Sequence, residues 1–277
     1  MICPTEGTHD ELHDELHGKL EEIEQLYSEG DNDAAWDKLE EARRGFPADD
    51  ELRVWSGVLL LARDDPDGAL VAFDKVLQEH PDHWAARLEH GYVLSELGRF
   101  EEALEDFKRV EEAARTEMLV PEMARLLYGK ALCLDRAGSA EDADHNFFLA
   151  AALLPEEFQR PPRLPPAEFQ TLVETAIDSI PGELRTHLRQ VMLAVHDYPQ
   201  GEQAEVDPFL LGLYVGVPRP RRDPDDTAQL DHIFIFKRVL EIEFPERDEL
   251  VEQIRRTVIH EVAHHFGLEE KDMGEYA

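Results

Sequence analysis

The sequence predicts two domains, an all-helical solenoid of repeats followed by a small α+β domain. Three observations predict this. A pattern of alanine, bulky and small residues recurs every 34 residues in the first half of the chain. A proline-dense segment follows, and beyond it two strand-like apolar runs lie between helical patterns. We therefore expect a repeat domain over residues 11–155, a linker over 156–165 and an α+β domain over 166–277.

Composition and charge limit the classes of protein. The 277 residues can supply two domains, each with its own core. With 62 acidic and 28 basic residues the net charge is −34, so nucleic acids and anionic membrane surfaces would be repelled. No apolar run approaches the ~20 residues of a membrane span, and the N-terminus lacks the pattern of a secretory signal. We expect no nucleic-acid or membrane partner, and a cytoplasmic location.

The repeats are anchored by Ala35, Ala69 and Ala103, which lie 34 residues apart. A bulky residue follows each alanine by four positions and a small or branched one by three more; these are Leu39, Phe73, Phe107, Ala42, Val76 and Val110. Such offsets share one face of a helix. Pro47 and Pro81 then close the first two copies, because proline cannot continue a helix.

A fourth copy begins at Ala143, which is 40 residues after Ala103, so about six extra residues are expected around "RTEMLVPEM". Its further positions are Phe147, Ala150 and Pro155. The segment 11–155 resembles a tetratricopeptide repeat (TPR) domain, in which helix pairs stack into a curved solenoid. The resemblance implies a concave surface that binds a protein or peptide, although some such arrays only dimerise or stiffen a neighbouring domain.

The proline-dense segment "PEEFQRPPRLPPAEF" favours an extended, semi-rigid spacer. The next segment, 166–180, has helical spacing, and Pro181-Gly182 ends it. We expect strands in "QVMLAVHDYP" and "HIFIFKRVLEIEF", and between them, at 208–231, a loop that begins apolar. A long helix over 246–267 ends at a glycine. The predicted order is helix, strand, loop, strand, helix.

The last helix carries His260, Glu261 and His264 in the pattern H-E-x-x-H. At 100° per residue these three side chains share one face, while the opposite face is apolar. Two imidazoles at this spacing can bind one Zn²⁺ at ~2.0–2.1 Å, with a third protein ligand and one position left for water. Glu261 can then act as general base.

The third ligand is predicted from an extended pattern, H-E-x-x-H-x-x-G-x-x-H, whose last histidine binds zinc. Gly267 matches the glycine, and Glu270 occupies the last position. Because a carboxylate can also bind zinc, Glu270 is the first choice. The alternatives are Glu269, Asp272, Glu275 and His232.

Three neighbouring features have open interpretations. His265 points about 100° away from His264, so it either pairs with Glu261 or Glu269 or is exposed. Tyr214 is either a packed residue or a stabiliser of the oxyanion. The arginine-rich stretch 219–222 is a solvated loop or a site for acidic peptide.

The segment "HEVAHHFGLEEKDM", with "LLGLYVGVP" and "IFIFKRVL" ahead of it, resembles the minimal zincins, a family of small bacterial zinc metallopeptidases. The resemblance covers about residues 165–277. It implies zinc on His260 and His264, with Glu261 as the base. That family usually has aspartate at the third-ligand position, where this chain has Glu270.

The leading hypothesis is a zinc metallopeptidase whose repeats bind a protein partner or substrate. The alternative is a non-catalytic TPR scaffold for protein binding, in which metal only stabilises a zincin-like domain. A third possibility, an acidic chaperone-like scaffold, needs no metal.

Overall fold

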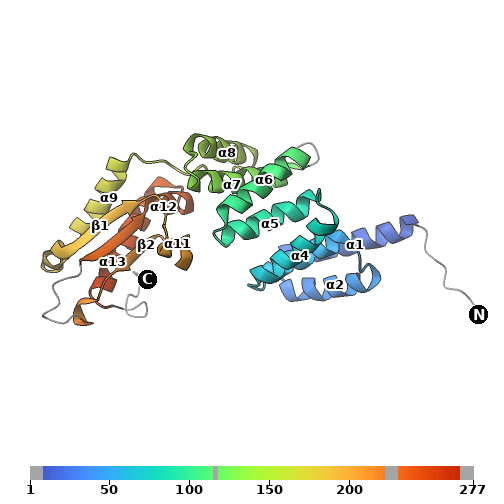
Figure 1. Cartoon of the computed structure of the whole chain (residues 1–277), viewed down its shortest axis with the longest axis horizontal. Helices are drawn as coiled ribbons and strands as arrows, with labels where there is room; N and C mark the ends of the chain where they lie inside the picture. The colour runs from blue at the N-terminus through green and yellow to red at the C-terminus, as the bar shows by residue number, and fades with distance from the viewer. Residues whose placement is uncertain (1–8, 115–117, 222–229, 269–277) are drawn as a thin grey trace, which may run out of the picture. The chain divides into compact units, whose positions relative to one another are not determined.

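The structure is a computed structural model that describes residues 9–114, 118–221 and 230–268 (Figure 1). The chain divides into two compact units between Asn146 and Phe147. This division falls inside one helix, and the predicted domain boundaries at 155 and 166 stay predictions. None of the described helices is long and apolar enough to cross a membrane.

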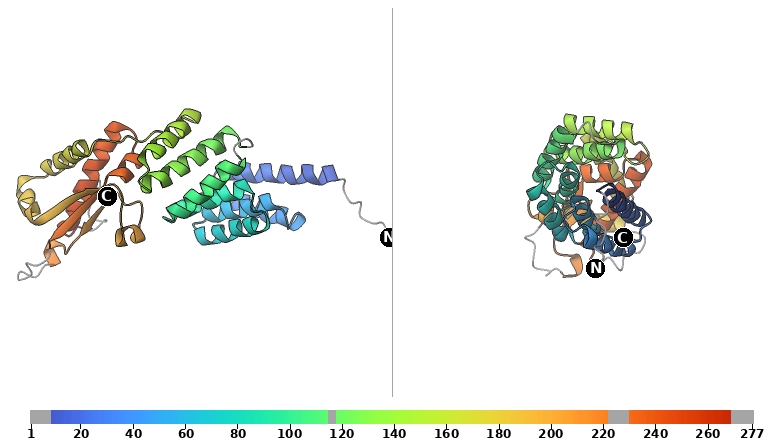
Figure 2. Two further views of the ribbon diagram at one scale, coloured as in Figure 1. Left: turned by 45° about the horizontal axis from the view of Figure 1, so that its top comes forward. Right: turned by 90° about the vertical axis from the view of Figure 1, so that its right-hand side faces the viewer.

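The first unit contains the helices α1 (His9–Ser28), α2 (Asn32–Gly45), α3 (Asp50–Leu61), α4 (Pro66–Glu79), α5 (Trp84–Glu96), α6 (Phe100–Ala114) and α7 (Val120–Arg136). Each of them packs against the next in chain order, and Figure 2 shows them stacked side by side from blue to green. Helix α8 (Ala140–Leu153) follows and contains the division between the two units. Aspartates 31, 49 and 65 cap α2, α3 and α4, because each carboxylate accepts a backbone N–H three residues later. The predicted all-helical repeat fold is confirmed.

The repeating positions of the helices are buried. The predicted alanine, bulky and small residues of all four copies are fully buried; they are Ala35, Leu39, Ala42, Ala69, Phe73, Val76, Ala103, Phe107, Val110, Ala143, Phe147 and Ala150. The insertion lies at the α6–α7 connection, where residues 115–117 are outside the described part. Helix α7 has 17 residues where α5 has 13.

Glycines at the 34-residue period let neighbouring helices approach closely. A Cβ atom on Gly57 would overlap the ring of Phe73, and one on Gly91 would lie 2.9 Å from Cε1 of Phe107. Gly57 and Phe73 belong to α3 and α4, which pack as one pair. In these two repeats the phenylalanine therefore fills space that the glycine leaves open.

Gly57→Ala is expected to lower the free energy of unfolding of the repeat unit by about 1–3 kcal/mol, because the added methyl overpacks the Phe73 ring. Gly45→Ala is the matched control, since nothing lies within 4 Å of a Cβ atom there. Urea unfolding followed by tryptophan fluorescence measures the change, because Trp36, Trp55 and Trp84 all lie in this unit. Equal midpoints for the two variants would contradict the close approach of α3 and α4.

The second unit is a small α+β domain. Its elements are α9 (Pro166–Asp178), α10 (Gly182–Arg185), η1 (Thr186–Gln190), β1 (Val191–His196), α11 (Glu202–Val206), β2 (Gly212–Val215), η2 (Arg219–Arg221), β3 (Asp231–Phe236), α12 (Lys237–Glu243) and α13 (Arg247–His265). Within the described residues the three strands form one sheet in the order β1-β3-β2. Strand β3 runs parallel to β1 and antiparallel to β2. Helices α9 and α13 pack against each other and share one core with β3.

Two predictions for this unit were wrong. The segment 208–231, predicted as a loop, contains β2, whose residue Tyr214 pairs with Ile233 on β3. The segment 232–244, predicted as one strand, changes to helix α12 after Phe236. The period-2 pattern of "HIFIF" ends there, and the charged residues that follow have helical spacing.

Helix α12 holds a buried ion network that explains this change. Oε2 of Glu241 accepts hydrogen bonds from Lys237 Nζ at 3.1 Å and from Arg238 Nη1 at 2.5 Å. The other oxygen, Oε1, accepts from the backbone N–H of Leu164 at 2.8 Å, and Arg238 also donates to the carbonyl of Pro162. Only a helix brings side chains three and four residues apart to one carboxylate. The network also fixes the end of the proline-rich segment to α12.

Candidate metal centre

Helix α13 has one buried face and one face that carries the H-E-x-x-H residues. Ile254, Val258 and Val262 are buried in the core, as their helical phase predicts. The helix ends where expected: Gly267 has φ +82°, its N–H donates to the carbonyl of His264, and the N–H of Leu268 donates to that of Ala263. This left-handed glycine terminates the helix and directs the chain away from its axis.

The two motif histidines converge on one point. Nε2 of His260 and Nε2 of His264 are 3.1 Å apart, and both side chains are half-buried. Two nitrogen ligands of a tetrahedral zinc at ~2.0–2.1 Å would be separated by about 3.3 Å. The two imidazoles therefore fit a single zinc ion.

A third ligand is not found among the described residues, since no other histidine, cysteine, aspartate or glutamate there forms a group with His260 and His264 within 4.8 Å. His232 stacks on Phe234, on the face of β3 opposite to Ile233, which packs in the α13 core. This arrangement removes His232 as a candidate. The other four candidates, Glu269, Glu270, Asp272 and Glu275, lie outside the described residues, so their assignment stays a prediction.

The side chain of Glu261 lies against strand β2 at Gly212, where the strand approaches α13 closely. The residue is 6% exposed, and a Cβ atom on Gly212 would lie 2.9 Å from its Oε1 and 2.8 Å from Cγ2 of Thr257. Glycine at position 212 thus leaves the space in which the Glu261 carboxylate sits. The sequence reasoning missed Gly212, although a single glycine inside an apolar run is a known signal of close backbone approach.

A pocket of about 330 Å³ adjoins this carboxylate. One wall is the face of α13 that carries the motif, and the other is the chain entering β2. Its lining residues are Leu210, Leu211, Gly212, Gln253, Arg256, Thr257, His260 and Glu261. The candidate metal-binding face is therefore next to a space that a substrate can enter.

His265 is buried and not exposed, and its Nδ1 lies 2.7 Å from Oδ2 of Asp231 at the start of β3. Its predicted partner Glu269 lies outside the described residues. The same oxygen accepts a hydrogen bond from the Tyr214 hydroxyl at 3.0 Å, and the rings of Tyr214 and His265 pack edge to face. Tyr214 is thus packed, which is one of the two interpretations that the sequence left open. This contact joins the end of α13 to both β2 and β3.

The stretch after β2 packs over the end of α13. The guanidinium of Arg219 lies 6.0 Å from the ring centre of Phe266, and a Cβ atom on Gly267 would lie 2.9 Å from Cγ of Pro220. The side chain of Arg221 and the whole of Arg222 are outside the described part. Arg219 is exposed, and its guanidinium lies over the ring of Phe266 at the end of α13.

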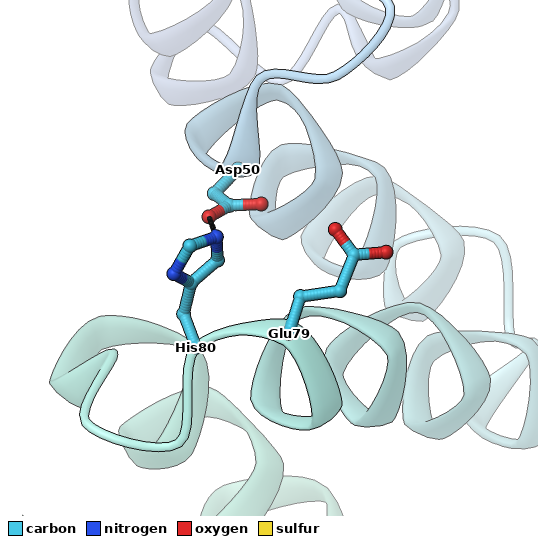
Figure 3. A group of neighbouring side chains, drawn as sticks. All are labelled: Asp50, Glu79 and His80. Carbon is cyan, nitrogen blue, oxygen red and sulfur yellow. Dashed lines mark ion pairs between the residues drawn. The ribbon is translucent and has the colours of Figure 1, made fainter.

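A second group of possible ligands lies in the repeat unit and consists of Asp50, Glu79 and His80 (Figure 3). Nε2 of His80 is 3.1 Å from Asp50, but Arg53 also donates to Asp50 at 3.0 Å and to Glu79 at 2.5 Å. The hydrogen bond from Arg53 lowers the pKa of Glu79 below its usual value. Because Arg53 already neutralises these carboxylates, we interpret the group as an ion-pair cluster that joins α3 to α4.

Solved structures similar to this chain are TPR proteins. PilF of Pseudomonas aeruginosa has 16% identity and a TM-score of 0.47 over 60% of this chain and 68% of its own. MamA from Desulfovibrio magneticus RS-1 has 24% identity and a TM-score of 0.41 over 63% and 90%. TTC0263 of Thermus thermophilus has 21% identity and a TM-score of 0.43 over 62% and 86%. No curated protein matches this chain.

Family models match both units. Residues 20–83 and 60–119 match models described as tetratricopeptide repeat. Residues 188–277, which include the whole H-E-x-x-H helix, match the model described as zincin-like metallopeptidase. The family models therefore find tetratricopeptide repeats over residues 20–119 and a zincin-like metallopeptidase domain over residues 188–277.

Proposed function

We propose that this protein is a zinc-dependent peptidase whose TPR region binds a protein partner or substrate. His260, His264 and Glu270 would hold the zinc, and Glu261 would be the general base. The observation that carries the proposal is the 3.1 Å approach of the two Nε2 atoms, with Glu261 beside an open pocket on the same helix face. The match to the zincin-like metallopeptidase family supports it.

Zinc held by these residues would supply Lewis-acid polarisation of the peptide carbonyl and would lower the pKa of the attacking water. The Glu261 carboxylate takes a proton from that water as the new C–O bond forms. The same carboxyl then gives the proton to the amine nitrogen as the C–N bond breaks, so that an acid and an amine are released. The nearly complete burial of Glu261 excludes bulk water that would compete for this proton.

The repeat region supplies binding and does not supply chemistry. Helix pairs of this kind build an extended surface along the solenoid. Its match to TPR models supports a role in binding a protein or peptide segment, which would raise the local concentration of substrate at the second unit.

Zinc content of the purified protein tests the metal site. Elemental mass spectrometry after dialysis is expected to find about one zinc per chain, with most of it lost in His264→Ala and Glu270→Ala, because each removes one of three protein ligands. His232→Ala is the matched control and should retain zinc, since this imidazole lies on the opposite face of β3.

Two other results of the zinc measurement would change the proposed assignment. Absence of zinc after reconstitution would leave the repeats as the functional part. Zinc retained in Glu270→Ala but lost in Glu269→Ala, Asp272→Ala or Glu275→Ala would identify that carboxylate as the third ligand.

A further inference from the structure

On the α13 side, the pocket beside Glu261 is lined by polar and charged side chains that share one face of the helix. Gln253, Arg256, Thr257 and His260 follow one another at spacings of three, one and three residues, which places them on a single helical stripe. Leu210 and Leu211 supply apolar surface from the opposite wall. The volume of about 330 Å³ is at the lower end of the range for ligand pockets, roughly 300–1,000 Å³.

Arg256 brings positive charge to this pocket in a chain with a net charge of −34. The adjacent Arg255 does not line the pocket, and its guanidinium makes two hydrogen bonds to Glu252, at 2.9 and 2.7 Å. An arginine fork is shaped to bind a carboxylate through two parallel hydrogen bonds. Gln253, one turn earlier, can add an amide N–H donor.

We propose that this pocket binds a carboxylate of the substrate, with Arg256 as its main partner. The proposal rests on the peptidase function proposed above and specifies its substrate class. Arg256 precedes His260 by four residues, so the two are separated by about 6 Å along the helix axis. A peptide spans roughly 3.3–3.6 Å per residue, so the bound carboxylate lies one or two residues from the bond to be cleaved.

Two sources can present this carboxylate. One is the C-terminus of a peptide, which would make the enzyme release one or two terminal residues. The other is an aspartate or glutamate side chain near the cleavage position. Both use the same contact with Arg256, and the experiment separates them.

The test uses full-length, zinc-loaded Glu261→Gln protein, immobilised so that peptides bind without being cleaved. Three matched hexapeptide mixtures of uncharged residues are applied: one with a free C-terminus, one amidated, and one amidated with a fixed glutamate. Mass spectrometry measures the retained fraction. One carboxylate-bearing mixture is expected to be retained about tenfold to a hundredfold more than the neutral amide, which identifies the source.

Adding Arg256→Gln should reduce that retention to the level of the neutral amide, and Arg256→Lys should restore part of it. Arg255→Gln is the matched control and should change nothing, because that side chain does not line the pocket. Equal retention of all three mixtures, or a preference that survives Arg256→Gln, would overturn the carboxylate site.

Turnover by the wild-type chain tests the proposed peptidase separately. Carboxylate-selective retention without any hydrolysis would support the binding site and refute the peptidase. Hydrolysis without a carboxylate preference would support the peptidase and refute the carboxylate-binding site.

Discussion

Glu261→Gln is expected to reduce peptide hydrolysis by at least about 10²–10⁴-fold while zinc stays bound. Glutamine has nearly the same shape and can still occupy the space beside Gly212, but its amide cannot accept the proton of the attacking water. Steady-state cleavage of an unfolded protein substrate and zinc content, measured on the same preparation, check both parts of this expectation.

The matched control is Glu249→Gln, an exposed carboxylate in the first turn of the same helix, which should leave hydrolysis unchanged. A Glu261→Gln protein that keeps both zinc and full activity would refute the general-base role. Joint loss of zinc and activity would instead make Glu261 a ligand.

Gly212→Ala tests the same carboxylate from the other side. The added methyl would lie 2.9 Å from Oε1 of Glu261, so the carboxylate must shift away from its present position. Turnover should fall while zinc content stays near one per chain, since the three heavy atoms nearest to that methyl position belong to Thr257 and Glu261 and not to a motif histidine. A Gly212→Ala enzyme as active as wild type would show that catalysis tolerates displacement of Glu261.

Glu241→Gln is expected to lower the free energy of unfolding of the second unit by about 3–5 kcal/mol, because it leaves two buried cations without their shared anion. Lys237 and Arg238 are both buried and both donate to Oε2 of Glu241. Another acidic neighbour of Lys237, Asp197, is 3.9 Å away and largely exposed, so it offsets little of the loss.

Hydrogen–deuterium exchange read by mass spectrometry measures this effect, because it follows peptides of α12 and α13 separately from the repeats. Glu243→Gln is the matched control, an exposed carboxylate on the same short helix. Tryptophan fluorescence reports on the repeat unit, where all three tryptophans lie, and serves as an internal reference. Unchanged exchange in Glu241→Gln would mean that the ion network contributes no net stability.

The sequence by itself determined the helices whose buried residues recur at a regular spacing. The 34-residue spacing placed Ala69 and Phe73 in the core of the repeats, and both are buried. The phase of α13 likewise separated its buried face from the face of His260 and His264. These signals are readable because helix geometry converts spacing along the chain directly into direction in space.

Tertiary structure alone decided the contacts between segments distant in sequence. Strand β2 is only four residues long, and its extended conformation depends on pairing with β3. The residues around Tyr214 alone therefore show too short a pattern to predict a strand. Asp231 was not identified as the partner of His265, because the two are 34 residues apart and meet only when the start of β3 reaches the end of α13. Helical spacing could orient His265, but only the packed sheet could supply the carboxylate that it contacts.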